Sequence, residues 1–358
     1  MFIKKLILGS LFLSTVTVSM AKTVVTGERF KNKQVISSLD VDDLQPGKYE
    51  LFMKLTENSI GQPYYVPVTV IKGKNPGPKF MLTSGVHGDE INSILALNKV
   101  KGKLTSKNIN GTVTIVHMLN IPGILSNSRN YLSTGRYPSS TNLNRGIDAG
   151  DDTYSEEIYS KKLWEDILKP NADFAIDMHT GGATKFPFLI YLTDNNAKVK
   201  KMAEISGADI AKIELEGTEG AVEDAYLKLG VPAITYEVGT GTKIEPGLVD
   251  RAVDGVMNTL VYSGNMKGTI KNKKKPEFVN EWNRISAENA GMVEYKVKLN
   301  DKVKVGDIIA VGYDNFGNVI VEYRTDKSGL VASLRDYPFF EKGYTVGRVA
   351  YKVDSKKN

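Results

Sequence analysis

The sequence contains no cysteine and only three histidines among 358 residues. Without cysteine, disulfide bonds and thiolate metal sites are excluded, so a transition-metal site must use imidazole and carboxylate ligands. Two of the histidines, His87 and His179, lie in the segments SGVHGDE and AIDMHTGG. Because little else in the chain can bind a transition metal, these two segments are the first candidates for a functional site.

Long apolar runs are absent after residue 21, and residues 6–18 form the one mostly apolar run before it. This run follows Lys4 and Lys5 and precedes a small-residue cleavage site that ends at Ala21, which is typical of an export signal. It is shorter than the roughly 20 residues of a comfortable bilayer span. We expect cleavage of residues 1–21, location in the periplasm or cell envelope, and no stable membrane span in the mature protein; an uncleaved membrane anchor is the alternative.

Strong charge of one sign is also lacking, since the formal net charge is +6. Basic residues gather at residues 271–275, but no aromatic side chains lie between them, so this segment indicates a solvated linker and not a nucleic-acid surface.

Strands and helices alternate through the middle of the chain. Apolar, β-rich runs occur at residues 64–71, 79–86, 112–119, 174–179, 188–192 and 231–238, and helical patterns follow residue 90 and occur at 155–168, 219–229 and 245–262. This alternation predicts an α/β sheet with helices on both faces. After residue 264, short β runs with glycine turns predict a small all-β barrel or sandwich.

The expected organisation follows from these patterns. It comprises a signal peptide (1–21), a polar and irregular N-terminal extension (22–60), an α/β domain (61–265), a lysine-rich linker (266–284) and a C-terminal β domain (285–358).

His87 and Glu90 are three residues apart at a strand-to-helix junction, where both side chains can face one ion. His179 ends a later strand, and Asp177 lies on the same face, where its carboxylate can accept the second ring N–H of a ligating histidine. Taken alone, the His-x-x-Glu spacing is equally that of a surface pair at a helix start. His117 lies inside the apolar strand TVTIVHML, which indicates a core or subunit-contact residue and not a fourth ligand.

Other polar residues suggest how a substrate is held. Asn144 and Arg145 lie in the irregular stretch 121–152, and an amide beside an arginine fork is suited to binding a substrate carboxylate, although a solvated surface turn has the same sequence. Glu237 ends an otherwise apolar strand, so we expect it to be paired, metal-bound or catalytic.

The motifs SGVHGDE, TNLNRG, DMHTGG and ITYEVG, in this order, resemble those of the succinylglutamate desuccinylase/aspartoacylase family, which is related to the zinc carboxypeptidases. The resemblance covers roughly residues 60–262. It implies a zinc carboxypeptidase-like α/β/α domain with a mixed sheet, and the C-terminal region is similar to the barrel-sandwich appendage of many members. By position, it implies that one zinc ion is held by His87, Glu90 and His179 and that Glu237 is the catalytic base.

The resemblance also implies that Asn144 and Arg145 hold the substrate carboxylate. It implies Arg136 as the arginine that stabilises the oxyanion, with Arg129 as the rival. Many relatives have Asp where this chain has Asn142, and a different sequence follows Arg145, so the shape of this loop is the part of the site that the motifs do not define.

Together these features predict an exported zinc-dependent amidohydrolase, a deacylase acting on an N-acyl amino acid or short peptide-like amide with a free carboxylate. Water activated by zinc would attack the amide, with Glu237 as general base. The alternatives are a carboxypeptidase-like enzyme acting on peptidoglycan stem peptides, and a non-catalytic metal-binding or ligand-binding module of the same fold.

Overall fold

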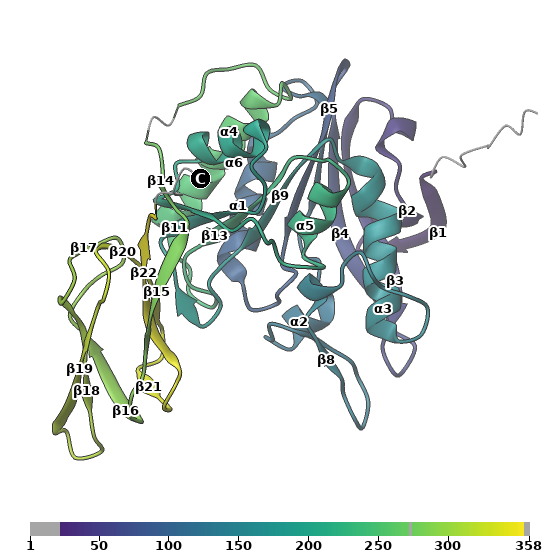
Figure 1. Ribbon diagram of the computed structural model, residues 1–358. Coiled ribbons are helices and arrows are strands. Elements are labelled where there is room, and N and C mark those ends of the chain that lie inside the picture. The colour runs from purple at the N-terminus through teal and green to yellow at the C-terminus, as the bar shows by residue number, and fades with distance from the viewer. Residues whose placement is uncertain (1–21, 272–273, 354–358) are drawn as a thin grey trace, which may run out of the picture.

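The computed structural model describes residues 22–271 and 274–353, which form an α/β domain followed by a smaller β domain (Figure 1). The expected signal peptide, residues 1–21, lies outside the described residues. Of the helices within the described ranges, none combines the length and hydropathy that a bilayer crossing requires.

A mixed 11-stranded sheet forms the centre of the larger domain, in the order β1-β2-β3-β4-β6-β5-β9-β13-β11-β12-β14. Its strands are β1 Val24–Phe30, β2 Lys33–Ser38, β3 Gly47–Glu57, β4 Pro63–Lys72, β5 Asn75–Ser84, β6 Asn110–Val116, β9 Phe174–His179, β11 Phe188–Leu192, β12 Ile210–Ile213, β13 Ala233–Val238 and β14 Glu277–Val279. The neighbours β6, β5, β9 and β13 run parallel, whereas β4 and β11 flank them antiparallel. The predicted mixed α/β sheet is confirmed.

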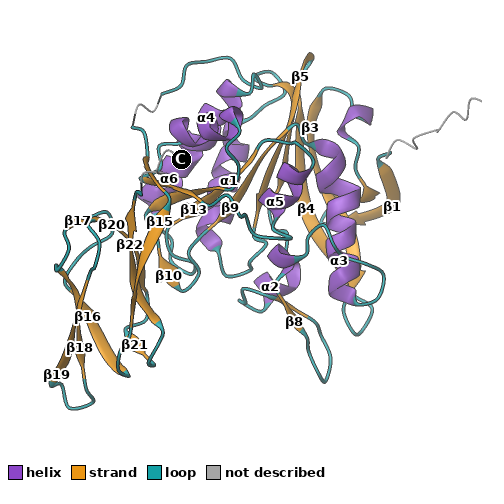
Figure 2. Ribbon diagram, in the orientation of Figure 1, coloured by secondary structure: helices purple, strands orange, loops and turns teal. Residues whose placement is uncertain are grey.

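Helices cover both faces of this sheet (Figure 2). On one face lie α1 Ile91–Lys103, α4 Ala197–Ile205 and α6 Pro246–Tyr262, whose apolar side chains form one core cluster with the sheet. On the other face lie α3 Ser155–Leu163, which continues as a π-helical turn to Leu168, and α5 Val222–Lys228, which belong to a second core cluster. Short 3-10 turns occur at Val41–Asp43 and Lys169–Asn171. The sequence patterns did not predict α4 or β12.

The expectation that residues 22–60 are irregular was wrong, because β1, β2 and β3 extend the main sheet at its edge. Strand β1 is exposed along almost its whole length, so it carries no apolar alternation that sequence reading can detect. It is held by antiparallel pairing with β2 across a tight turn at Lys31 and Asn32, whose φ angles are 45° and 61°.

The stretch between residues 120 and 152 contains only short elements, as its composition predicted. They are α2 Ile121–Leu125, β7 Tyr131–Leu132, β8 Ser140–Thr141 and a 3-10 turn at Leu143–Arg145. The stretch is anchored where Tyr131 packs edge-to-face on Tyr159 of α3, with ring centroids 5.3 Å apart. This contact holds the stretch against α3.

The C-terminal domain is all β, as predicted, and is built from two small sheets around its own core. Its strands are β15 Glu281–Ser286, β16 Gly291–Tyr295, β17 Lys302–Val303, β18 Ile308–Tyr313, β19 Val319–Arg324, β20 Gly329–Arg335, β21 Phe339–Phe340 and β22 Thr345–Tyr351. The predicted linker 266–284 is partly structured, since β14 pairs with β12 of the main sheet. The two domains are joined again by β10, Thr184–Lys185, which pairs with β20, and by a shared apolar cluster.

The register of the central strands brings polar residues together on the α3/α5 face of the sheet. Thr83 of β5 is the partner of Asp177 of β9, which is the partner of Thr235 of β13. Two residues further on, His179 is the partner of Glu237. Because these three strands are parallel, the polar stripe lies at their carboxyl ends, where α/β sheets bind ligands.

Candidate active site

The three predicted ligands lie at the carboxyl ends of β5 and β9. After β5 the chain turns at Gly85, whose φ of 70° suits glycine, and reaches His87 before α1 begins. Gly88 packs so closely on α2 that a Cβ there would lie 2.2 Å from the Gly123 carbonyl carbon, which fixes the path of the loop. Glu90 occupies the N-cap position of α1, and His179 is the last residue of β9.

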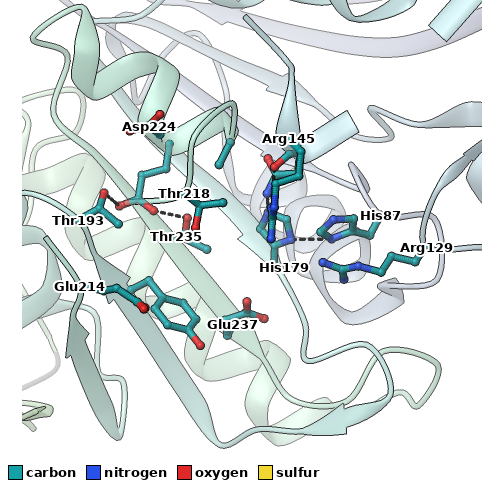
Figure 3. Close-up of a pocket in the computed structure, with 14 residues that line it drawn as sticks. His87, Arg129, Arg145, His179, Thr193, Glu214, Thr218, Asp224, Thr235 and Glu237 are labelled. Carbon is teal, nitrogen blue, oxygen red and sulfur yellow. Dashed lines mark hydrogen bonds between the residues drawn. The ribbon is translucent and has the colours of Figure 1, made fainter. Parts of the chain in front are cut away.

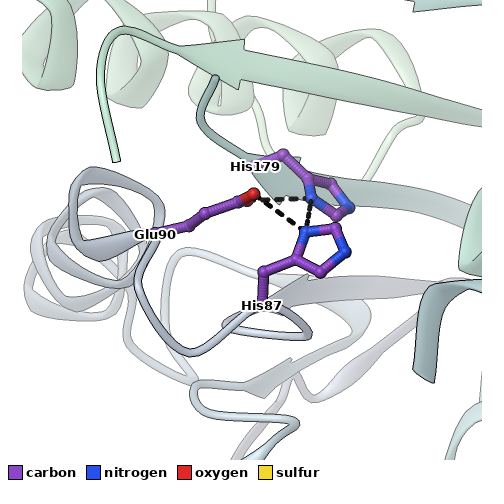
Figure 4. Close-up of side chains that lie close together, drawn as sticks. All are labelled: His87, Glu90 and His179. Carbon is purple, nitrogen blue, oxygen red and sulfur yellow. Dashed lines mark hydrogen bonds and ion pairs between the residues drawn. The ribbon is translucent and has the colours of Figure 1, made fainter. Parts of the chain in front are cut away.

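The structure brings His87, Glu90 and His179 together in a buried cluster (Figure 4). Glu90 Oε1 lies 2.8 Å from His87 Nδ1, and Glu90 Oε2 lies 2.9 Å from His179 Nδ1. The two Nδ1 atoms are 3.1 Å apart. Two imidazole nitrogens and a carboxylate that all lie within 4.8 Å of one another fit a divalent transition metal with a further coordination position left for a ligand.

The nitrogens that face away from the cluster are held by hydrogen bonds. His179 Nε2 lies 2.6 Å from Asp177 Oδ2, and the Thr83 hydroxyl donates to the other oxygen of Asp177 at 2.6 Å. His87 Nε2 lies 3.1 Å from Asn142 Oδ1. Such partners fix the ring orientation and leave both Nδ1 atoms pointing at the ion position. The contact of Asp177 with His179 was expected from the sequence. The contact of Asn142 with His87 was not, although Asn142 lies in the motif that drew attention to Asn144.

The three side chains of the cluster shift one another's pKa values. Burial opposes ionisation of Glu90, but the two histidines outweigh it and hold its pKa well below the usual value. Burial likewise disfavours the charged form of His179, yet Asp177 and Glu90 raise its pKa well above 6.5. Burial lowers the pKa of His87. The cluster is thus a set of buried anionic and imidazole groups that attract positive charge.

Glu237 lies beside this cluster and lines the same cavity of about 220 Å³ (Figure 3). Its Oε2 atom is buried and has no hydrogen-bond partner among the described residues. Burial raises the pKa of Glu237 well above its usual value, and the negative charge of Glu90 adds to the rise. A carboxyl group without a protein partner in a cavity is free to exchange a proton with a bound molecule.

Two arginines reach the cavity from the stretch between residues 120 and 152. Arg129 Nη1 donates to Glu90 Oε1 at 2.8 Å, and Arg145 Nη1 donates to the Asn144 carbonyl oxygen at 2.7 Å. Burial lowers the pKa of Arg145, and the positive charge of Arg129 lowers it further. Two neighbouring cations in one cavity favour an anionic ligand. Arg136 is not among the lining residues: it is exposed, and its guanidinium stacks on Tyr137 at 5.6 Å.

Asn144 also lines the cavity, but its amide oxygen already accepts a hydrogen bond from the Val222 backbone N–H at 2.9 Å. Its Nδ2 lies 3.5 Å from His179 Nε2. Asn144 therefore connects the loop to the start of α5, beside the cluster of His87, Glu90 and His179. Its Nδ2 group remains the part of the amide that can contact a bound molecule.

Sequence reasoning missed the end of the cavity that lies away from the arginines. Figure 3 shows Thr193, Thr235, Glu214 and Asp224 on that side, opposite Arg129 and Arg145. Glu223 lines the cavity as well. In the sequence, acids at the start of a helix are typical of N-terminal turns, so nothing distinguished those of α5 from an ordinary helix start.

His117 is buried away from this cluster, and its Nε2 lies 2.9 Å from the Thr69 hydroxyl. Burial lowers its pKa to about 4. The geometry agrees with a core histidine and not with a fourth ligand.

Comparison with known proteins gives the family. A profile described as the succinylglutamate desuccinylase/aspartoacylase catalytic domain matches residues 76–263, more than half of the chain. The chain is 29% identical over 330 residues to N-alpha-acetyl-L-2,4-diaminobutyric acid deacetylase of Halomonas elongata, covering 88% of this chain and 94% of that relative.

Solved structures agree with this assignment. The product-bound ectoine utilization protein EutE (DoeB) from Ruegeria pomeroyi has a TM-score of 0.75 and 26% identity, with 86% of this chain and 97% of that chain covered. A succinylglutamate desuccinylase/aspartoacylase from Rhodobacter sphaeroides has a TM-score of 0.77 at 22% identity, with 88% and 98% covered, and supports the fold. The segment matched by the profile carries the whole ligand cluster and Glu237. This chain belongs to the succinylglutamate desuccinylase/aspartoacylase family of amide-cleaving hydrolases.

Proposed function

We propose that the protein is an exported zinc-dependent deacylase that removes the acyl group of a small N-acyl amino acid. The observation that carries the proposal is the content of one cavity. A candidate metal-ligand cluster, two arginines and Glu237, whose buried Oε2 has no hydrogen-bond partner among the described residues, all line it or border it. Amide hydrolysis next to a free carboxylate needs a proton acceptor, positive charge at the developing oxyanion and a site for the carboxylate.

His87, Glu90 and His179 would hold the ion, and zinc is the metal that best suits two imidazoles, one carboxylate and an open position. Zinc bound there supplies Lewis acidity, which makes water more acidic and an amide carbonyl more electrophilic. Asp177 and Asn142 keep the two imidazoles aimed at the ion position.

Glu237 accepts the proton of the attacking water and then protonates the leaving amine. Its place follows from the sheet register, because Glu237 is the strand partner of the ligand His179. Burial raises the pKa of Glu237, which makes its carboxylate a better proton acceptor than a solvent-exposed one.

Arg145 binds the substrate carboxylate, and Arg129 stabilises the oxyanion. Arg129 reaches Glu90 Oε1 at 2.8 Å, so its guanidinium borders the ion position, whereas Arg136 lies outside the cavity. An N-acetyl amino acid is the first substrate to test, because the Halomonas elongata relative is named for deacetylation of N-alpha-acetyl-L-2,4-diaminobutyric acid.

Arg129→Gln is expected to lower kcat by about 10²-fold, which is the usual loss when one oxyanion donor is removed. Arg136→Gln, the matched control on the exposed loop, should leave kcat unchanged. Both variants are to be compared by steady-state kinetics on metal-saturated protein, with metal content measured because Arg129 also contacts Glu90. A loss of kcat in Arg136→Gln with normal kcat in Arg129→Gln would reverse the assignment.

The overall proposal is tested by incubating zinc-loaded protein with a panel of N-acyl amino acids and muropeptides. Release of the free amino acid from N-acyl substrates supports the deacylase. Cleavage of muropeptides alone would favour the carboxypeptidase-like alternative, and binding of zinc without hydrolysis of any substrate would favour a non-catalytic module.

Export is proposed from residues 1–21 alone, with their two lysines, apolar run and small-residue cleavage site. Cell fractionation and N-terminal sequencing are expected to find a mature protein outside the cytoplasm that begins at Lys22. A cytoplasmic protein that keeps Met1 would overturn this part of the proposal.

A further inference from the structure

Glu223 is a buried carboxylate in the cavity that the proposed mechanism does not use. It belongs to α5, lines the cavity and is only 5% exposed. Its two oxygens accept hydrogen bonds from two hydroxyl groups, from Thr193 just after β11 at 3.0 Å and from Thr235 of β13 at 2.5 Å. Both donors are neutral, and within residues 22–271 and 274–353 Glu223 takes part in no ion pair.

A buried carboxylate without a counter-charge is costly, and burial accordingly raises the pKa of Glu223 to about 7. The two hydroxyl groups partly offset the effect of burial, and the negative charge of Asp177 adds to it. The group is therefore held in place by donors that stabilise its charged form while no protein cation neutralises it. A positively charged ligand would supply the missing counter-charge.

The neighbouring acids do not share this property. Asp224 is already paired with Lys228 of the same helix at 2.9 Å, and Glu214 is exposed to solvent. They make this end of the cavity negative, whereas the opposite end carries Arg129 and Arg145 (Figure 3). A molecule that fills the cavity thus meets positive charge at one end and negative charge at the other.

The position of Glu223 relative to the reacting bond follows from the sheet. Thr235, which donates to Glu223, lies two residues before Glu237 on the same face of β13, and two residues along a strand span about 7 Å. The Glu223 carboxylate therefore lies one short side chain away from the amide held beside Glu237. A chain of a few methylene groups ending in an amine spans this separation.

We propose that Glu223, held by Thr193 and Thr235, binds a side-chain ammonium group of the substrate and selects N-acyl diamino acids over N-acyl amino acids with neutral side chains. This inference rests on the proposed deacylase function and adds to it the residue that determines specificity. Arg145 binds the carboxylate at one end, and Glu223 binds the ammonium group at the other.

The test compares N-acetyl-2,4-diaminobutyrate with the neutral N-acetylnorvaline on the zinc-loaded mature chain. The unmodified protein should prefer the diamino substrate. Glu223→Gln should lower kcat/KM for it by about 10- to 100-fold, the range expected for a lost hydrogen bond to a charged group, and change kcat/KM for N-acetylnorvaline less than about threefold. Glu216→Gln removes the same charge from an exposed position in the preceding loop and should change neither value.

Binding of free 2,4-diaminobutyrate, measured by calorimetry, separates this inference from the deacylase proposal because it needs no turnover. Weaker binding to Glu223→Gln, with an unchanged melting temperature, supports the ammonium site even where no substrate is hydrolysed. Equal losses for both substrates, or equal binding of the diamine to both proteins, would overturn the ammonium site while hydrolysis of N-acetylnorvaline still supports the deacylase.

Discussion

Glu237→Gln is expected to lower kcat by about 10²–10⁴-fold while zinc binding stays stoichiometric. Glutamine has nearly the same shape as glutamate but cannot accept a proton, so the substitution removes the proposed base without opening space. Glu237 is not one of the three clustered residues, and within the described part of the chain its Oε2 atom has no hydrogen-bond partner to lose. The loss should therefore appear in kcat and not in metal affinity.

Stability provides an independent check on this variant. Because burial opposes the charged form of Glu237, replacing it with a neutral amide should leave the melting temperature unchanged or raise it. The comparison needs kcat, zinc content and thermal unfolding on the same preparations, with Glu216→Gln as the exposed control. A kcat within a few-fold of that of the unmodified protein would exclude Glu237 as the general base.

Much of the cluster of His87, Glu90 and His179 could be predicted because its residues lie at or just after the ends of strands that the sequence pattern defines. Apolar runs defined β9 and β11 at their observed bounds, and His179 ends the first of them. Parallel neighbours bring their carboxyl ends to one edge, so the loop after β5 and the end of β9 had to meet. The convergence of His87, Glu90 and His179 is a consequence of that topology.

The arginine that borders the ion position could not be chosen from the sequence. Arg129 and Arg136 lie in the same irregular stretch, where no periodicity tells which side chain points inward. The choice depends on tertiary contacts: the Ser128 carbonyl accepts a hydrogen bond from the Gly88 backbone N–H at 3.0 Å, which brings the residue after it beside Glu90. Arg136 lies four residues after the short strand β7, in an exposed bend.

The acidic end of the cavity could not be predicted from the sequence for a different reason. Glu223 looks like an acid that complements a helix dipole, and its burial becomes apparent only when α5 packs on β13. Its two hydroxyl partners are Thr193, which follows β11, and Thr235 of β13. They are 42 residues apart in the sequence, and β11 and β13 become neighbours only in the folded sheet. The acidic end of the cavity depends on how α5 packs on the sheet, whereas the cluster of His87, Glu90 and His179 depends on the order of the strands.

Removal of the metal is expected to abolish turnover and leave the fold intact. In the cluster Glu90 pairs with both histidines and also accepts hydrogen bonds from Arg129 and the Thr180 backbone N–H, so these partners keep its buried charge compensated without an ion. Chelation should therefore lower the free energy of unfolding only by the contribution of zinc binding, about 4 kcal/mol at a thousandfold excess of zinc over its dissociation constant. The melting temperature should fall accordingly. Added zinc should restore both stability and turnover.

His179→Ala separates loss of the ion from loss of the fold. It removes one of three ligands and also leaves Asp177 without its imidazole partner, so zinc stoichiometry and turnover should both fall to background even with excess zinc. His117→Gln is the matched control, because His117 is the one remaining histidine of the sequence and contacts Thr69 away from the cluster; it should keep one zinc per chain. Full zinc occupancy in His179→Ala, or full activity after chelation, would exclude the cluster as the catalytic metal site and would leave Glu237 and the two arginines to act without an ion.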